Sequence, residues 1–360
     1  MFIRCIDRAH VIRLAPITLF ISILFACTDQ DTPRSKLFAY SAFPDVIKTD
    51  SGKIIVVFYN GSEHAPKYEN EKRPSKGGRI MFSESLDEGK TWSVPISIVD
   101  TPFDDRDPSI FQASDGRLLL NFFVRVATNT SSMVETFITE SSDEGKTWKE
   151  PRRVMRRKAT TSPIRALKDG RLAMTVYEPP GGCTILFSKD NGRTWGDASD
   201  IGGYGNSDLS EPDVVEVGNK LIAYMRSDVT TMRSAESTNG GKTWSPLKDC
   251  GFVGAAPYIY NYNNEAVLLA HRIPTTSIKL WFPKLDKWTD NFIVDYDMEA
   301  NGAYPSLTHI NAKKFLIVYY YEHEKDVDSS IRIRTIELVT DYLHVSDDFS
   351  EIAVREVVTF

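Results

Sequence analysis

Cysteine is scarce in this chain of 360 residues, which contains four. Cys5 and Cys27 belong to the N-terminal segment, so Cys183 and Cys250 are left for the folded part. We expect these two to be separate buried thiols rather than a disulfide. The sequence also lacks the CxxC and HExxH patterns of metal sites and the glycine-rich loop that holds a nucleotide phosphate. No metal ion and no cofactor is therefore expected.

The N-terminal segment lacks a hydrophobic run long enough to cross a membrane. Its apolar run, residues 14–26, is shorter than the roughly 20 residues that a spanning helix needs. The run follows three arginines and ends in the sequence LFAC at Cys27, which resembles a bacterial lipobox. We expect a signal peptide over residues 1–27, lipidation of Cys27 after cleavage, and a polar tether at 28–36. An ordinary signal peptide or an uncleaved anchor is the alternative.

A lipid on Cys27 predicts a lipoprotein of the cell envelope, in the outer membrane or at the cell surface or periplasm. The lipid would be the chain's one link to the membrane.

An excess of positive charge is lacking as well. The chain carries 43 Lys and Arg against 49 Asp and Glu, a formal net charge of −6 at pH 7. Loss of the basic N-terminal segment makes the mature chain more negative still. A net-negative protein does not favour nucleic acid or an anionic lipid surface as a partner. Any anionic ligand must therefore be held by a local cluster of arginines.

What the sequence does have is a repeat that begins at a proline and continues with a basic or apolar strand-like segment. The prolines are Pro44, Pro108, Pro163, Pro212, Pro257 and Pro305. The segments begin at Lys53, Arg117, Arg171, Lys220, Ala266 and Lys314. A repeat of this length, built from strands and turns, indicates a β-propeller. We therefore expect an all-β, six-bladed β-propeller over residues 37–360. Either residues 36–43 or the strands after Ile331 would complete its last blade.

A second repeat, out of phase with the first, has the form Ser-x-Asp-x-Gly-x-Thr-Trp. Its four copies end at Trp92, Trp148, Trp195 and Trp244. Asn239 replaces Asp in the fourth copy, and a decayed fifth copy ends at Trp288. The Asp or Asn can cap backbone N–H groups of a tight hairpin, and Gly supplies the positive φ. These are Asp-box repeats, and with them the chain resembles the bacterial sialidase (neuraminidase) superfamily, whose fold is a six-bladed propeller. We expect the boxes to stabilise the fold.

In a propeller, the segments that begin the innermost strands meet at one rim of the central axis. The side chains beside the prolines are therefore expected to form a single pocket, together with those at the ends of the second strands. The polar candidates at this rim are Arg106, Asp107, Arg165, Glu211, Arg226, Arg272 and Tyr304.

The resemblance implies a nucleophile and its base. Sialidases use a tyrosine nucleophile whose proton is taken by a glutamate, because a carboxylate nucleophile would be repelled by the substrate carboxylate. By similarity, Tyr304 would be the nucleophile and Glu211 the base, with Glu322 in the place of a recurrent later glutamate. Structural interpretations stay open beside these: Glu211 can form an ion pair with Arg226, and the Tyr304 hydroxyl can bond to the backbone.

The resemblance also implies an arginine cluster for the substrate carboxylate. Arg226 and Arg272 match two of its members. The third belongs to a Phe-Arg-Ile-Pro motif in the first blade, where this chain has Ala42. Arg106 or Arg165 would have to take its place.

A second departure concerns the acid that protonates the leaving oxygen. The family carries this aspartate in the loop after the second strand of the first blade. In this chain the corresponding residues 60–78 contain no aspartate. Glu63 or His64 from this loop, or Asp107 at the start of the second blade, is the candidate acid/base.

We therefore hypothesise a glycoside hydrolase of the exo-α-sialidase type, which acts as a monomer on a terminal acidic sugar of a glycan. Two alternatives stay open. The first is a related propeller enzyme on uronic-acid glycans, either a hydrolase or a β-eliminating lyase. The second is a glycan-binding lipoprotein without catalysis. Fold alone does not choose among them.

Overall fold

The protein is represented by a computed structural model. It describes residues 38–352 except 66–76, 128–131, 180, 203–207, 274, 285–286, 296–302, 312 and 340–341. The predicted signal peptide at 1–27, Cys27 and the tether at 28–36 lie outside the described residues. All of the described elements are strands, and no described helix is long and apolar enough to span a bilayer.

The described strands follow one another in six groups. The first two are β1 (Tyr40–Lys48), β2 (Ile54–Gly61), β3 (Arg79–Ser85) and β4 (Ile96–Val99), then β5 (Asp104–Gln112), β6 (Leu118–Ala127), β7 (Ser132–Ser141) and β8 (Arg152–Arg156). The next two are β9 (Arg165–Ala166), β10 (Leu172–Tyr177), β11 (Cys183–Ser188) and β12 (Gly196–Ile201), then β13 (Leu209–Val217), β14 (Lys220–Ser227), β15 (Arg233–Ser237) and β16 (Lys248–Asp249). The last two are β17 (Ala255–Tyr262), β18 (Ala266–Arg272), β19 (Ser277–Phe282), β20 (Lys287–Trp288) and β21 (Phe292–Ile293), then β22 (Ala303–Asn311), β23 (Lys314–Glu324), β24 (Asp328–Val339) and β25 (Tyr342–Ile352).

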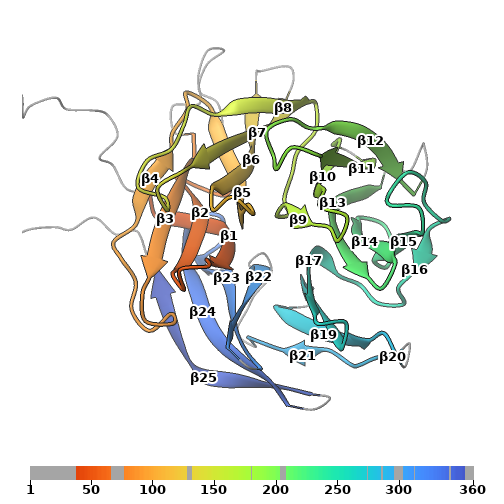
Figure 1. Cartoon of the computed structure of the whole chain (residues 1–360). Coiled ribbons are helices and arrows are strands. Elements are labelled where there is room, and N and C mark those ends of the chain that lie inside the picture. The colour runs from red at the N-terminus through yellow and green to blue at the C-terminus, as the bar shows by residue number, and fades with distance from the viewer. Residues whose placement is uncertain are drawn as a thin grey trace, which may run out of the picture. The chain divides into compact units, whose positions relative to one another are not determined.

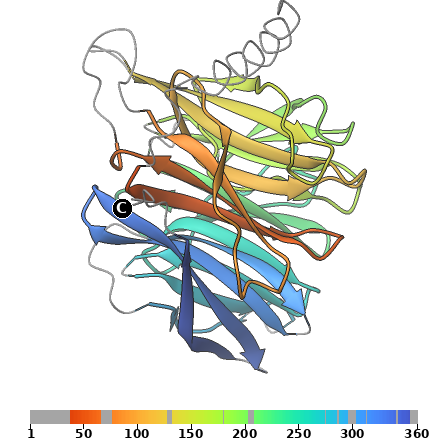
Figure 2. The same ribbon diagram turned by 90° about the vertical axis from the view of Figure 1, so that its left-hand side faces the viewer.

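Within each group the strands pair antiparallel, and the groups surround a common centre with their first strands innermost (Figure 1). This is the arrangement of a β-propeller, so the all-β propeller predicted from the sequence is confirmed. β24 and β25 are the outer strands of the last group, and β24 pairs with β1 as well, so both segments named in the sequence prediction contribute to this sheet. The first and last groups lie side by side (Figure 2), and one parallel pair, Tyr40 with Ser329, joins them in a single sheet.

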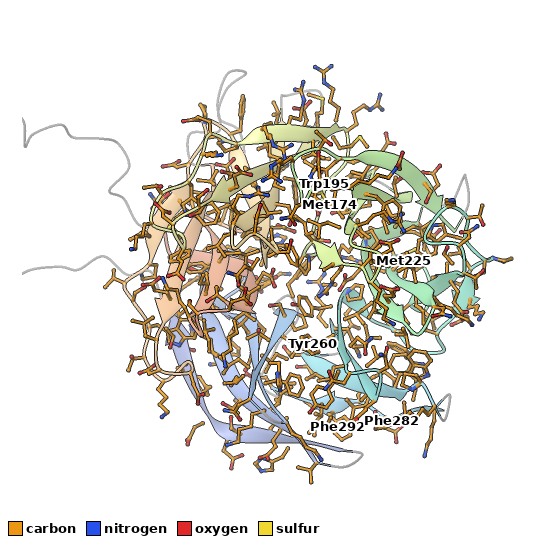
Figure 3. The ribbon with its side chains drawn as sticks, viewed as in Figure 1. Met174, Trp195, Met225, Tyr260, Phe282 and Phe292 are labelled. Carbon is orange, nitrogen blue, oxygen red and sulfur yellow. The ribbon has the colours of Figure 1, made fainter. Side chains whose placement is uncertain are left out.

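The hydrophobic core lies between neighbouring groups. Strands alternate sides, so apolar residues of one group face those of the next. Between the second and third groups, for example, Leu119 of β6 and Ile138 of β7 belong to one core cluster with Met174 of β10, beside which Trp195 lies (Figure 3). The two cysteines of this part are free, as predicted. Cys183 is buried in the core, but the prediction of burial is wrong for Cys250, which is half-buried because it follows the short outer strand β16.

The Asp boxes form the tight hairpins that the sequence predicts. In the second box, Asp143 accepts hydrogen bonds from the Thr147 backbone N–H (2.9 Å) and hydroxyl (2.6 Å), and Gly145 has a φ of 90°. The Trp148 indole N–H donates to the Gly145 carbonyl (3.0 Å). The fourth box keeps this geometry because the Asn239 oxygen accepts the Thr243 N–H in the same way (3.0 Å).

Polar contacts between neighbouring groups stabilise the propeller both near its axis and farther from it. Near the axis, Asp45 accepts the Ile110 N–H (2.8 Å) and Asp213 accepts the Ile259 N–H (2.8 Å), each from the next group. Farther out, the Arg117 guanidinium donates to the Asn191 carbonyl of the next group's Asp box (2.8 Å). The boxes therefore bind their neighbours as well as closing their own hairpins.

Candidate active site

A shared backbone distortion marks the rim of the axis. Five residues that precede the repeat prolines have positive φ: Phe43 (51°), Asp107 (46°), Glu211 (49°), Ala256 (49°) and Tyr304 (42°). At each of them the pairing register with the second strand shifts, as in a β-bulge. Positive φ is strained for a residue other than glycine, and such strain is concentrated at functional sites.

Two of these residues form the closest polar contact of the site. The Tyr304 hydroxyl donates a hydrogen bond of 2.5 Å to Oε1 of Glu211. The same oxygen accepts Nη1 of Arg226 at 3.0 Å, and Oε2 accepts the Ala256 backbone N–H at 3.0 Å. Burial, and then the Glu211 carboxylate, raise the pKa of the Tyr304 hydroxyl well above its usual range. The phenol is therefore protonated at neutral pH, with a carboxylate in place to take its proton.

Both arginines predicted from the ends of second strands lie at this pair. Arg226 is the penultimate residue of β14; its Nη1 contacts Glu211, and its Nε contacts Asp228 at 2.7 Å. Arg272 ends β18, and its guanidinium lies 4.9 Å from the centroid of the Tyr304 ring. Two cations therefore flank the phenol.

Arg106 comes to the same region from β5 and is almost fully buried. Its guanidinium lies over the rings of Phe43 (5.1 Å) and Tyr59 (4.9 Å). Its Nη1 donates to Oδ2 of Asp104 (3.2 Å) and to the His64 carbonyl (2.8 Å). The charge of Arg106 is thus balanced in part by a buried carboxylate.

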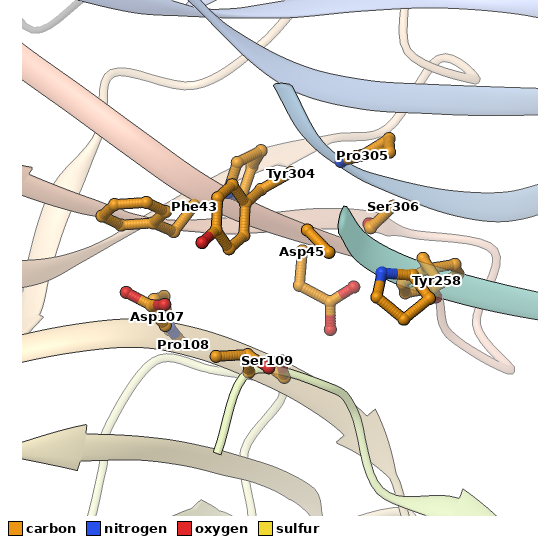
Figure 4. Close-up of a pocket in the computed structure, with 13 residues that line it drawn as sticks. Phe43, Asp45, Asp107, Pro108, Ser109, Tyr258, Tyr304, Pro305 and Ser306 are labelled. Carbon is orange, nitrogen blue, oxygen red and sulfur yellow. The ribbon is translucent and has the colours of Figure 1, made fainter. Parts of the chain in front are cut away.

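Asp107 faces Tyr304 across a small pocket (Figure 4), which both residues line. Its side chain is 9% exposed, and its Oδ1 lies 3.8 Å from Nε of Arg106, beyond hydrogen-bond distance. Within the described residues this oxygen has no hydrogen-bond partner. Burial raises the pKa of Asp107 to about 7; Arg106 opposes the shift and the nearby Glu211 carboxylate adds to it.

The two candidates from the first-blade loop lie differently. The His64 ring packs against Phe43 (centroids 5.7 Å apart), and its Nδ1 is 3.7 Å from Oδ1 of Asp326. Burial, and then Arg106, lower the pKa of His64 to about 4. Glu63 is half-buried, and its carbonyl accepts a long hydrogen bond from the Tyr59 hydroxyl (3.4 Å).

Arg165 lies with other partners. Its Nε and Nη2 both donate to the Asp213 carboxylate, at 3.1 and 2.5 Å, and its guanidinium covers the Tyr258 ring at 4.6 Å. Since Asp213 also caps the backbone of β17, this pair ties the third group to its neighbours. The placement favours a structural role for Arg165 over the predicted carboxylate contact.

Ala42 is fully buried in β1, so the position at which the resemblance implies an arginine supplies no cation. Its neighbour on the same face of the strand, Tyr40, donates its hydroxyl to Oε1 of Glu322 at 2.8 Å. The other oxygen of Glu322 is buried and, within the described residues, unpaired.

Comparison with known proteins places the chain in a family. The family described as BNR repeat-like domain matches residues 79–312, more than half of the chain. The chain belongs to the BNR repeat-like family.

Relatives of this BNR repeat-like protein include sialidases. A sialidase of Bacteroides fragilis is 25% identical over 190 residues, which are 47% of this chain but only 34% of that relative. A protein of unknown function from Dyadobacter fermentans has a TM-score of 0.72 at 20% identity, covering 84% of this chain and 97% of that one. The NanB sialidase from Streptococcus pneumoniae has a TM-score of 0.64 at 15% identity, covering 89% and 69%. The structural likenesses confirm the sialidase-like propeller fold.

Two residues of the candidate active site were not predicted from the sequence, although their positions in the repeats could have indicated them. Phe43 occupies the same pre-proline position as Asp107 and Tyr304, and its ring meets the Tyr304 ring edge-on at 4.9 Å. Asp104 lies two residues before Arg106 in a strand, hence on the same face. By contrast, Tyr40 and Glu322 lie 282 residues apart, and no pattern in the sequence around either residue indicates their contact.

Proposed function

We propose that this BNR repeat-like protein is a glycoside hydrolase of the exo-α-sialidase type, which releases a terminal acidic sugar from a glycan. The observation that carries the proposal is the hydrogen bond of 2.5 Å between Tyr304 and Glu211. A buried phenol with a carboxylate on its proton and arginines beside it is suited to nucleophilic attack on a sugar that itself carries a carboxylate.

The Tyr304–Glu211 pair would work as nucleophile and base. Tyr304 is protonated in the resting site, so attack of its oxygen on the anomeric carbon requires transfer of the proton to Glu211. The attacking oxygen belongs to a neutral phenol, and the negative charge of Glu211 lies one hydrogen bond farther away, where Arg226 offsets it. The pair therefore repels an anionic substrate less than a carboxylate nucleophile would.

Arg226 and Arg272 would bind the substrate carboxylate. They flank Tyr304 from two different groups, so a carboxylate on the anomeric carbon would meet both guanidinium groups as the carbon approaches the phenol oxygen. Arg106 adds a third positive charge beside Phe43, although its Nη1 already bonds to Asp104. We propose it, rather than Arg165, as the replacement for the arginine missing at Ala42.

The predicted lipid on Cys27 would place this activity at the cell envelope. A propeller on a short tether would act there on glycans outside the cytoplasm as a monomer, and Glu63, His64 and Asp107 stand as candidates for the acid.

The test is turnover of an α-linked sialic acid with a fluorescent leaving group by the wild-type chain and by Tyr304→Phe. We expect release of the fluorophore by the wild type and loss of at least about 10⁴-fold in kcat in the variant, with an unchanged circular dichroism spectrum. Retention of more than a few per cent of activity contradicts the nucleophile assignment. An unsaturated, ultraviolet-absorbing product from uronic-acid glycans points to elimination, and affinity without turnover points to a binding protein.

A further inference from the structure

We propose that Asp107 is the proton donor to the leaving oxygen and, in the second half of the reaction, the base that activates water. The inference rests on the proposed function and assigns the role that the first-blade loop leaves unfilled.

Position is the first argument. The five pre-proline residues with positive φ occupy equivalent points, each at a register shift between the first two strands of its group, and Phe43, Asp107 and Tyr304 line one pocket. Phe43 and Ala256 cannot move a proton. Of the other three, Tyr304 and Glu211 already share one proton, which leaves Asp107. It lines the pocket across from Tyr304 (Figure 4), as a group on the opposite side of a reacting sugar must.

The hydrogen-bond state of Asp107 is the second argument. Both oxygens of Glu211 hold hydrogen bonds, whereas Oδ1 of Asp107 is buried without one among the described residues. A buried polar group without a partner costs free energy and calls for an explanation. A carboxyl group kept available for the glycosidic oxygen provides it, since the hydrogen bond then forms only with substrate.

The surrounding charges support proton donation. Asp107 forms a long ion pair with Arg106 (3.8 Å from Oδ1 to Nε) that includes no hydrogen bond, while Nη1 of Arg106 donates to Asp104, so Oδ1 of Asp107 stays available to a substrate oxygen. With the pKa of Asp107 raised to about 7 by burial and by Glu211, a large fraction of the carboxyl groups is protonated near neutral pH. A pKa near the working pH suits a group that must give and regain a proton.

The loop candidates are less suited. With its pKa lowered to about 4, His64 is neutral at pH 7 and has no proton to give as an imidazolium. Its Nδ1 is directed to Asp326, and its backbone carbonyl holds Arg106. His64 therefore orders the wall of the site.

The two half-reactions balance. In the first, the Tyr304 oxygen bonds to the anomeric carbon, its proton passes to Glu211, and the glycosidic bond breaks with its electron pair on the leaving oxygen, which takes the proton of Asp107. In the second, the Asp107 carboxylate takes a proton from water as the water oxygen bonds to the anomeric carbon. The tyrosyl oxygen leaves and regains its proton from Glu211. Sugar and alcohol are the products, and both carboxyl groups return to their initial states.

The test compares Asp107→Asn with the wild-type chain on two α-sialosides, one with an umbelliferyl and one with a methyl leaving group. Asparagine is isosteric and tolerates positive φ. The umbelliferyl group departs as an anion without help, but the methoxyl group needs a proton. We expect kcat/KM on the methyl sialoside to fall about 10²–10⁴-fold and that on the umbelliferyl sialoside to fall less than about tenfold, with a burst of fluorophore as the glycosyl-enzyme accumulates.

Two further variants complete the design. Asp197→Asn is the matched control, because it makes the same chemical change at a position that also has positive φ (50°) but lies exposed in the outer strand β12, and its kinetics on both substrates should be unchanged. Asp107→Glu keeps a carboxyl group, so it should recover part of the methyl-sialoside activity even if the Asn variant folds poorly.

Equal losses on the two substrates in Asp107→Asn would show that Asp107 only positions the site, and near-normal hydrolysis of the methyl sialoside would exclude it as the acid. In both cases the proposed function survives if Tyr304→Phe still abolishes turnover. Absence of turnover by the folded wild-type chain on both sialosides overturns the two proposals together.

Discussion

Replacement of Glu211 by glutamine tests the centre of the site without changing its shape. Glu211 is 4% exposed and accepts three hydrogen bonds: Oε1 from Tyr304 and Arg226, Oε2 from the Ala256 N–H. A glutamine side chain fills the same volume but has one accepting oxygen and an NH₂ group that only donates. Whichever way the amide is turned, at least one buried donor therefore loses its acceptor.

The magnitudes follow from these contacts. An unsatisfied buried donor costs about 1–3 kcal/mol. The full penalty of a broken buried ion pair, about 3–5 kcal/mol, does not apply, because the Arg226 side chain is 25% exposed and keeps Asp228. We therefore expect Glu211→Gln to lose about 1–3 kcal/mol of stability. Loss of the base of Tyr304 should lower kcat about 10²–10⁴-fold, or roughly 3–5 kcal/mol of barrier.

Thermal unfolding followed by circular dichroism and kcat on the umbelliferyl sialoside measure the two effects. Because Glu211 helps to raise the pKa of Asp107, the alkaline limb of the kcat/KM profile on the methyl sialoside should also move to lower pH in the variant. Activity within tenfold of the wild type would refute Glu211 as the base. An unshifted limb would refute its electrostatic coupling to Asp107.

Two further predictions concern stability. Burial raises the pKa of Asp45 to about 6 and those of Asp105 and Asp107 to about 7 from an ordinary 3.8, so the folded chain holds protons that the unfolded chain releases. The stability that these groups contribute is complete below pH about 4 and is lost as the pH rises through 6–7. The Tm should therefore fall from pH 5 to pH 8, and Asp105→Asn should weaken that dependence. A Tm that rises over this range contradicts the reasoning. The Arg117 side chain is 10% exposed and contacts two carboxylates, so Arg117→Met should lower the free energy of unfolding, measured by chemical denaturation, by about 1–3 kcal/mol. Arg193→Met, at an exposed side chain, should lower it by less than about 0.5 kcal/mol. Equal losses in the two variants would argue that the contact between an Asp box and the neighbouring group does not stabilise the fold.

Much of the fold could be predicted because the sequence repeats itself. The proline and Asp-box repeats place each strand of a group, and equivalence between groups then places Glu211 and Tyr304, 93 residues apart, at one point on the axis. The contact of Glu211 with Arg226 follows more simply, since Glu211 lies near the start of β13 and Arg226 near the end of β14, the paired strands of one hairpin.

The partners of buried charges could not be predicted in the same way. Arg106 and Arg165 both lie beside prolines, yet one turns to Asp104 near the nucleophile and the other to Asp213 of the next group. Their choice depends on which carboxylate is within reach after burial, where an unpaired charge is costly. The position in the repeat therefore predicts that a side chain lies near the axis, but not which carboxylate it pairs with.

The strained backbone of the pre-proline residues explains why the candidate catalytic residues lie at these positions. In five of the six described groups a β-bulge at the residue before the proline gives that residue a positive φ, whether it is Ala256 or Tyr304. The strain is offset by contacts elsewhere, namely the Asp45 and Asp213 caps near the axis and the Asp boxes farther out. The backbone thus provides equivalent positions that differ only in the residue placed at each. One residue before this position the first group has Ala42, which carries no charge, and there the Arg106 guanidinium of the next group lies 5.1 Å from the centroid of the Phe43 ring.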